Sequence, residues 1–219
     1  MILTPVAFRD LTDLLSRFAD ALADQPWARA VFQRIAATLD KVAGQDLALS
    51  VDPLHHRQAV DLCHRFGMRT VAQPPRQSYT WDGEAVRVDC EPSVVIHEVA
   101  HLQCASPSRR KVLDFGLGAG PETGYRDEAD QAAGIFGVER DQEEALASLL
   151  GVLWEVELGQ PAILAFLEQN WLEGGAKPLN RHHFLKNLAI LRQNGLIDAD
   201  GHPTSQLRVI EDAEQFYRL

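Results

Sequence analysis

The 219-residue chain has few cysteines, a deficit of positive charge and no long apolar run. Its three cysteines, Cys63, Cys90 and Cys104, are odd in number and lack metal-binding spacing, which favours free thiols in a reducing compartment. Cys104 follows a histidine by three positions, but metals held by histidine and carboxylate rarely add a thiol, so we expect it in the core. The formal net charge of −10 argues against nucleic acid or an anionic membrane as partner and is compatible with a basic substrate.

No stretch is long enough to span a bilayer, and the first residues lack the charged, apolar and small-residue pattern of a secretory signal. We therefore expect a cytoplasmic protein with no membrane partner. A content of 46% hydrophobic and 24% charged residues is typical of one globular domain, or of one domain with an appended subdomain.

The most informative stretch is residues 94–102, in which His97 and His101 lie four positions apart with Glu98 between them. On an α-helix these two imidazoles emerge on one face, one turn apart, where they can bind one cation. This is the HExxH pattern, in which a carboxylate that can move a proton accompanies two imidazole ligands. The pattern could arise by chance on a helix surface. However, the flanking residues make this helix apolar almost all round, so we expect it to be buried. Two imidazoles and a carboxylate in a core would each cost on the order of several kcal/mol unless they are paired or bind a metal.

Two histidines need a third protein ligand, and the acidic candidates lie in a predicted helix over residues 139–154. Glu144, Ser148 and Gly151 fall on one line of that helix. Glycine inside a helix costs about 1 kcal/mol relative to alanine, so we expect Gly151 to permit close helix packing on the face that carries Glu144. We predict Glu144 as the third ligand and Ser148 as a hydrogen-bond partner of a ligand. The other acidic residues are expected on a solvated face: Glu139, Asp141 and Glu143.

The remaining pattern predicts a mostly helical α+β fold. Two amphipathic helices are expected within residues 1–50, a third helix begins at Asp52-Pro53, and Pro92 begins the HExxH helix. Period-two segments around an Asp-Gly turn between residues 68 and 89 predict a small antiparallel sheet beside that helix. The glycine-rich stretch 114–124 is expected to border the metal pocket rather than to be a plain surface loop. Helices are expected over 161–171, 181–194 (capped by Asn180) and 204–217, with His182 and His183 on a solvated face.

From Val60 to the C-terminus the chain resembles the bacterial elongation factor P hydroxylase family. That family has HExxH, then a paired arginine, Asp-Phe-Gly and a proline, which match Arg109-Arg110, Asp114-Phe115-Gly116 and Pro121. It also has a glutamate fifteen positions before Gly-x-Pro, as Glu144 precedes Gly159-Gln160-Pro161. The resemblance implies a zincin-like core, a ligand set of His97, His101 and Glu144, and hydroxylation of the modified lysine of elongation factor P.

Three functions follow from these patterns. The resemblance favours an iron(II) hydroxylase acting on a protein similar to elongation factor P. The motif alone favours a zinc-dependent metallopeptidase acting on a peptide, with Glu98 as acid–base; the segment from Glu144 to Gly151 is also similar to the third-ligand helix of thermolysin-like metallopeptidases. A binding protein with a structural metal would need a fourth ligand, for which Asp114 is the nearest candidate, but we expect Asp114 to orient a histidine.

The expected cofactor is one divalent metal ion, with iron(II) favoured and zinc as the alternative, because imidazole and carboxylate suit both. We expect residues 1–50 to form an N-terminal helical extension and residues 51–219 to form the metal-dependent catalytic domain.

Overall fold

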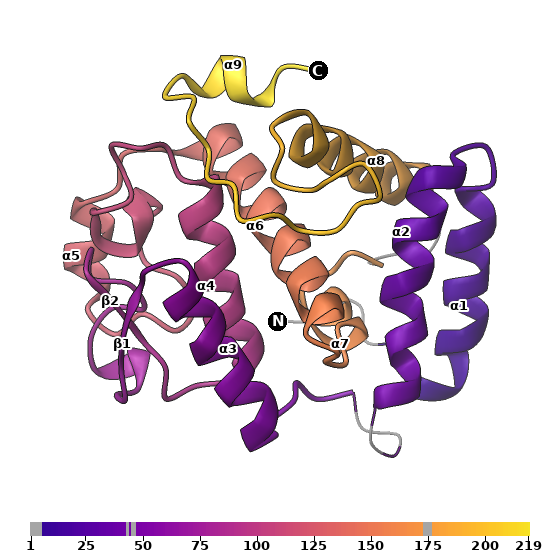
Figure 1. Ribbon diagram of the computed structural model, residues 1–219, viewed down its shortest axis with the longest axis horizontal. Coiled ribbons are helices and arrows are strands. Elements are labelled where there is room, and N and C mark those ends of the chain that lie inside the picture. Colours follow the sequence, from indigo (N-terminus) through magenta and orange to yellow (C-terminus); the bar gives the residue numbers. More distant parts are fainter. Residues whose placement is uncertain (1–5, 43, 45–46, 173–176) are drawn as a thin grey trace.

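The structure is a computed structural model that describes residues 6–42, 44, 47–172 and 177–219. It is mostly helical, with one small sheet (Figure 1). The helices are α1 (Phe8–Ala21), α2 (Pro26–Ala37), α3 (Pro53–Arg65), α4 (Pro92–Cys104), α5 (Arg126–Gln131), α6 (Gly137–Glu157), α7 (Ile163–Glu168), α8 (Pro178–Gln193) and α9 (Ala213–Tyr217). The strands are β1 (Arg69–Val71) and β2 (Ala85–Arg87), and short 3₁₀ turns cover Thr38–Lys41, Pro75–Gln77 and Leu113–Gly116. None of the described helices combines the length and apolar character needed to cross a lipid bilayer.

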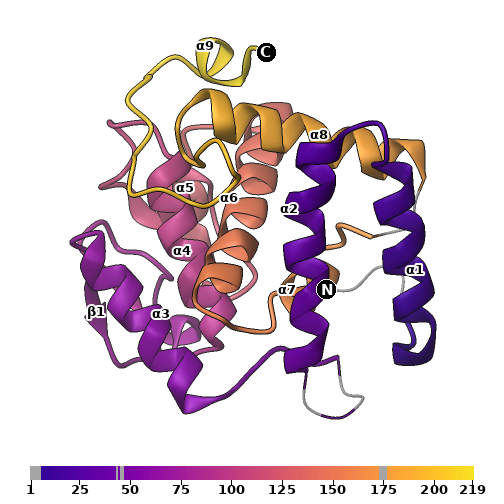
Figure 2. The same ribbon diagram turned by 45° about the vertical axis from the view of Figure 1, so that its right-hand side comes forward.

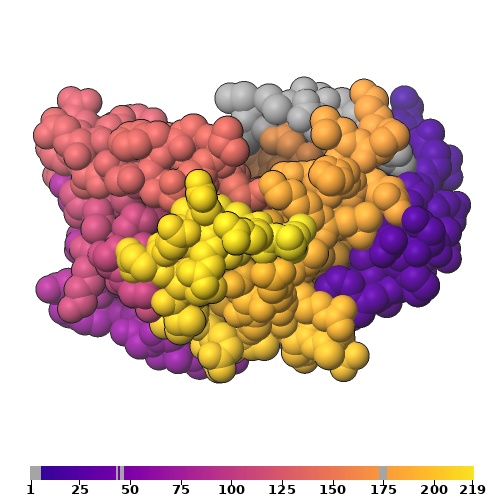
Figure 3. All heavy atoms as spheres, turned by 90° about the horizontal axis from the view of Figure 1, so that it is seen from above, coloured from indigo at the N-terminus to yellow at the C-terminus, as the bar shows by residue number. Residues whose placement is uncertain are grey.

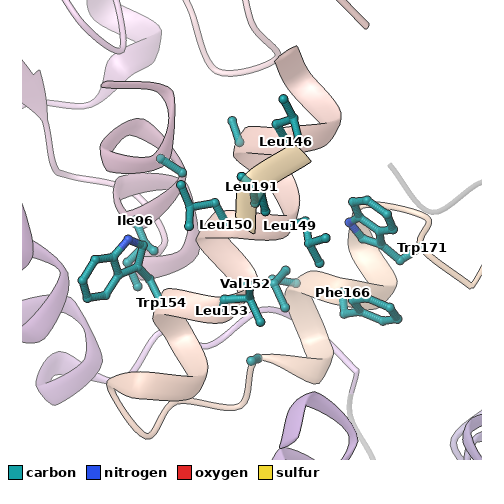
Figure 4. Packing of buried hydrophobic residues seen from close by; sticks show 14 of the residues in the cluster. Ile96, Leu146, Leu149, Leu150, Val152, Leu153, Trp154, Phe166, Trp171 and Leu191 are labelled. Carbon is teal, nitrogen blue, oxygen red and sulfur yellow. The ribbon is translucent and has the colours of Figure 1, made fainter. Parts of the chain in front are cut away.

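Helices α4 and α6 form the centre of the molecule and lie side by side (Figures 1 and 2). A Cβ atom added at Gly151 of α6 would stand 3.5 Å from the Cα of His97 on α4. The predicted role of Gly151 in close helix packing is therefore confirmed. Around this contact α6 is buried on several sides: Trp154 lies toward Ile96 of α4, and Val152 lies toward Phe166 (Figure 4).

The two N-terminal helices were predicted from their apolar spacing and are present as α1 and α2. They pack against α6, α7 and α8 through an aromatic group in which Phe18 stands 4.7 Å from Phe32 and 5.7 Å from Phe184, measured between ring centroids. Their buried residues belong to the same hydrophobic core as those of α4 and α6. Residues on either side of position 50 therefore share one core.

Local signals place the starts of the two helices nearest the motif. The carboxylate of Asp52 accepts a hydrogen bond from the backbone N–H of Leu54 at 2.7 Å and caps α3, and Pro92 is the first residue of α4, as predicted. The cap predicted for α8 is wrong, because α8 begins at Pro178 and contains Asn180 within its first turn.

The helix predicted over 204–217 is limited to residues 213–217. Before it the chain lies across α4, where the side-chain amide of Gln103 donates to the carbonyls of Thr204 and Gln206, both at 2.8 Å. The backbone N–H of Arg208 donates in turn to the carbonyl of Gln103 at 2.8 Å. These tertiary hydrogen bonds replace the i→i−4 bonds that a helix would need.

The antiparallel sheet predicted beside α4 is wrong, because β1 and β2 pair in parallel with Thr70 opposite Val86. The expected hairpin is reduced to one antiparallel bridge between Trp81 and Val86. The backbone N–H groups of Thr80 and Trp81 donate to the carboxylate of Asp114, at 3.1 and 3.0 Å, so they cannot extend an antiparallel ladder. Two short parallel strands do not support the zincin-like core that the resemblance implies.

Candidate metal centre

The structure brings the three predicted ligands together. His97 and His101 project from one face of α4 with ring centroids 4.3 Å apart. Oε2 of Glu144, on α6, lies 3.6 Å from Nε2 of His97 and 3.5 Å from Nε2 of His101. A metal with bonds of about 2.0–2.1 Å in tetrahedral geometry holds its ligand atoms about 3.4 Å apart. The two distances to Glu144 are close to this value, and the three ligand atoms all lie within 4.8 Å of one another, so the cluster could hold a metal ion.

The three ligands face a cavity of about 470 Å³. Gly120 and Pro121 form part of its wall, so the prediction that the glycine-rich stretch borders the pocket is confirmed. On other sides the wall includes Ser93 of α4 and Gln169, just after α7. Four carboxylates line this space, and the described lining residues include no lysine or arginine; the acidic residues are Glu98, Glu122, Glu144 and Glu168.

Burial and mutual charge shift the pKa values of the cluster. Burial acts to lower the pKa of His101, but the carboxylate of Glu144 outweighs it, with help from Glu98 and Glu143, and raises that pKa to about 9. Burial and the neighbouring His101 lower the pKa of His97. Burial would raise the pKa of Glu144, yet the two imidazoles hold it well below its usual range. Without a metal, His101 is therefore the protonated member of the cluster, and a bound cation would displace that proton.

Glu98 is 7% exposed and lines the same cavity. Burial raises the pKa of its carboxyl group to about 8, and the negative charges of Asp114 and Glu144 add to this effect. A carboxyl group with a pKa near neutrality can both accept and donate a proton at physiological pH. Its position next to two ligands is therefore compatible with the acid–base role predicted for it.

Asp114 does not orient a histidine as predicted. Its carboxylate accepts hydrogen bonds from the backbone N–H groups of Thr80 and Trp81 and from Oγ1 of Thr123, the last at 2.5 Å. Neither Nδ1 atom of the two ligand histidines has a hydrogen-bond partner among the described residues. Asp114 also lies outside the three-residue ligand cluster, so the part of the chain that the structure describes does not form a closed four-ligand site.

The ring of Phe115, the residue after Asp114, packs against the imidazole of His101. The two rings stack with centroids 5.8 Å apart, and the indole of Trp81 stacks on Phe115 at 5.3 Å. Asp114 and Phe115 have φ values of 40° and 54°, a left-handed conformation that costs about 1–3 kcal/mol per residue and persists only where surrounding contacts offset that cost. Hydrogen bonds to the Asp114 carboxylate and to the Phe115 carbonyl, which accepts from Arg109 at 2.6 Å, maintain it here.

Ser148 lines the cavity. The prediction that it would hydrogen-bond to a metal ligand is wrong. Its hydroxyl donates to the side-chain oxygen of Gln169 and accepts from the indole N–H of Trp171 at 2.7 Å. His183 stacks on Trp171, with ring centroids 4.8 Å apart, and borders the cavity. His182 and His183 are both exposed, as predicted for a solvated face of α8. The sequence carries no spacing signal that joins Gln169 and His183 to the HExxH motif, because they come from separate segments.

Glu143 is fully buried, so its predicted place on a solvated acidic face is wrong. Its Oε2 atom accepts hydrogen bonds from Arg109, from Arg208 at 3.3 Å and from the hydroxyl of Tyr217 at 3.2 Å. Two arginines compensate the buried charge, which explains how an acidic residue can occupy this position. Glu143 and Glu144 are consecutive, but one faces the arginines and the other faces the histidines.

The cysteines take no part in the ligand cluster. Cys104 is a buried free thiol, as predicted, and burial together with the nearby Glu143 carboxylate raises its pKa well above the usual value. Cys63 and Cys90 are also free. Comparison of the chain with protein-family models, curated proteins and solved structures gives no match.

Proposed function

We propose that the protein is a metal-dependent hydroxylase that modifies a basic side chain of a protein substrate, the activity implied by the resemblance to elongation factor P hydroxylases. The observation that carries the proposal is the three-ligand cluster of His97, His101 and Glu144 at the wall of an acidic cavity. Three protein ligands on one side of a six-coordinate iron(II) ion leave three positions for dioxygen, substrate or water. The proposed metal is iron(II), whose chemistry when bound is the activation of dioxygen.

The charge of the cavity supports a cationic substrate group. Four glutamates and no lysine or arginine line it among the described residues. Glu98, with its pKa near 8, is largely neutral at pH 7, and Glu122 is paired with Arg76 at 3.1 Å. An ammonium group would still meet a net negative lining and gain favourable electrostatic energy. The modified lysine of elongation factor P carries such a group. A translation factor as substrate would also place the enzyme in the cytoplasm.

The residues of this chain would have separate roles. His97, His101 and Glu144 would hold the metal, while Glu122 and Glu168 would attract the substrate amine to the cavity. Glu98, with its pKa near 8, would hold or release a proton beside the reacting group. Gly120 and Pro121 would cover one side of the substrate and limit the access of water.

A second candidate is a zinc-dependent metallopeptidase, favoured by the position of Glu98 in the motif. In that chemistry zinc lowers the pKa of its bound water to about 7. Glu98 would accept the proton from that water. The same three ligands serve both reactions, so the substrate and the metal distinguish them.

The test is anaerobic purification with metal analysis, followed by incubation with β-lysylated elongation factor P, iron(II), dioxygen and an external reductant. We expect the factor to gain the mass of one oxygen atom and the Glu144→Ala variant to produce no gain. Absence of a gain, together with retained zinc and cleavage of a peptide library, would refute the hydroxylase and support the peptidase.

A further inference from the structure

We infer that Arg109 is a positioning residue for the metal ligands: its guanidinium joins the buried carboxylate of Glu143, the neighbour of Glu144, to the backbone of Phe115, whose ring packs on His101. One side chain thereby connects the segments that support ligands from two different helices. The inference rests on the metal site of the proposed function and not on the reaction catalysed there.

Arg109 makes two hydrogen bonds in different directions. Its side chain is 11% exposed; Nη2 donates to Oε2 of Glu143, and Nη1 donates to the carbonyl of Phe115 at 2.6 Å. A guanidinium group is planar and presents its donors at fixed angles, so two bonds from one group fix the distance between their acceptors.

On the α6 side, the restrained residue is Glu143. Its carboxylate also accepts hydrogen bonds from Arg208, which is buried, and from Tyr217. Both belong to the C-terminal segment, whose yellow atoms cover part of the face shown in Figure 3. Because consecutive residues of a helix project about 100° apart, a fixed Glu143 side chain sets the rotation of the turn that carries Glu144. The carboxylate of Glu144 is thereby directed to the two imidazoles.

On the α4 side, the restrained residue is Phe115. Its left-handed backbone conformation needs external support, and the bond from Arg109 to its carbonyl supplies part of that support. Its ring lies between the indole of Trp81 and the imidazole of His101. Neither ligand imidazole has a hydrogen-bond partner at Nδ1 among the described residues, so ring packing is the contact that restrains His101 on this side.

The adjacent Arg110 offers a matched control. Its guanidinium donates to the carbonyl of Arg208, so it also attaches the C-terminal residues to the segment after α4. None of the hydrogen bonds of the described structure joins the Arg110 guanidinium to Glu143 or Phe115. Loss of either arginine should lower the melting temperature, whereas only loss of Arg109 should disturb the metal ligands.

The experiment is titration of cobalt(II) into full-length wild type, Arg109→Met, Arg110→Met and Arg109→Lys, at a temperature where circular dichroism shows each variant folded. We expect Arg109→Met to weaken cobalt affinity by about 10–100-fold and to alter the visible d–d spectrum. Arg110→Met should match wild type in both. Arg109→Lys keeps the charge beside Glu143 but cannot bond both acceptors in a fixed geometry, so we expect a smaller loss. It also provides the comparison if the methionine variant does not fold.

Equal cobalt affinities for the Arg109 and Arg110 variants would overturn the inference and leave the metal site intact. Wild-type protein that binds no cobalt would overturn the metal site of the proposed function and this inference with it. A hydroxylation assay without product, combined with the expected difference in cobalt affinity, would reject the proposed reaction and support the role of Arg109.

Discussion

Gly151 of α6 lies directly against the backbone of His97 on α4, with 3.5 Å from its missing Cβ position to the Cα of His97. The separation allows a methyl group at ordinary contact distance but nothing larger. The helix that supplies Glu144 therefore touches the helix that supplies both histidines at the backbone of His97 itself.

This contact predicts opposite effects for two substitutions at position 151. Gly151→Ala fills space that is available and favours the helix by up to about 1 kcal/mol, so stability should stay the same or rise. Gly151→Leu must push α4 away from α6 and should cost about 1–3 kcal/mol. Urea unfolding measures both, and cobalt titration should show weaker binding only for the leucine variant. A leucine variant as stable as the alanine variant would show that the helices do not pack this closely.

The carboxylates of α6 should differ sharply in metal binding. Glu144→Gln removes a predicted ligand and should weaken zinc or cobalt binding by more than about 100-fold. Loss of a residue that only hydrogen-bonds to a ligand costs less, about 10–100-fold. Glu139→Gln, in the first turn of the same helix, should bind metal like wild type. Metal content after dialysis against a weak chelator provides the comparison. Retention of metal by Glu144→Gln would assign the third ligand to another residue.

Metal binding should release protons in a pH-dependent way. In the metal-free protein the pKa of His101 is about 9, so at pH 7 a cation that binds Nε2 must displace about one proton. Zinc affinity should therefore rise as the pH increases from 7 toward 9, and proton release should decrease over the same range. Calorimetry at pH 7 in buffers of different ionisation enthalpy measures the number released. Identical enthalpies in all buffers would contradict a protonated His101.

Glu155, on α6, makes stability depend on pH without involving the metal. It is 4% exposed, and burial raises its pKa to about 8. The native state thus retains a proton that the unfolded chain loses above its ordinary pKa near 4.5, so the contribution of Glu155 to stability falls as the pH rises from 4.5 to 8. We expect Glu155→Gln to be more stable than wild type at pH 8.5, by on the order of a few kcal/mol. Near pH 4.5 the two should be similar.

Thermal melts of the metal-free proteins at the two pH values measure this difference. A variant whose advantage does not grow with pH would show that the carboxyl group of Glu155 is ionised in the folded protein.

Local pattern was sufficient to predict most of the longer helices and the three residues of the candidate metal cluster. The apolar period marks α1, α2 and α6, Pro92 marks the start of α4, and the four-residue interval places both imidazoles on one face. Glu144 and Gly151 lie on the same face of α6, and the glycine marks the face that contacts α4, so this pattern predicted Glu144 as the third ligand. Each of these signals acts within a few turns of one helix.

The errors concern partners that are far apart in the chain. Glu143 looks solvated in its local segment, and only the fold brings Arg208 to it. Asp114 bonds to Thr80 and Trp81 instead of a histidine, and these bonds also prevent the antiparallel ladder that the Asp-Gly turn suggests. A pattern read along one element does not contain the pairings that the tertiary structure selects.

The contact between Tyr217 and Glu143 makes the segment after α8 part of the surroundings of the predicted metal ligands. The hydroxyl of Tyr217 donates a hydrogen bond to the Glu143 carboxylate at 3.2 Å, and Glu143 precedes Glu144 on α6. Tyr217 lies 74 positions beyond Glu143 in the sequence, so these surroundings form only when distant segments come together. We therefore expect a chain shortened before Tyr217 to take up metal poorly.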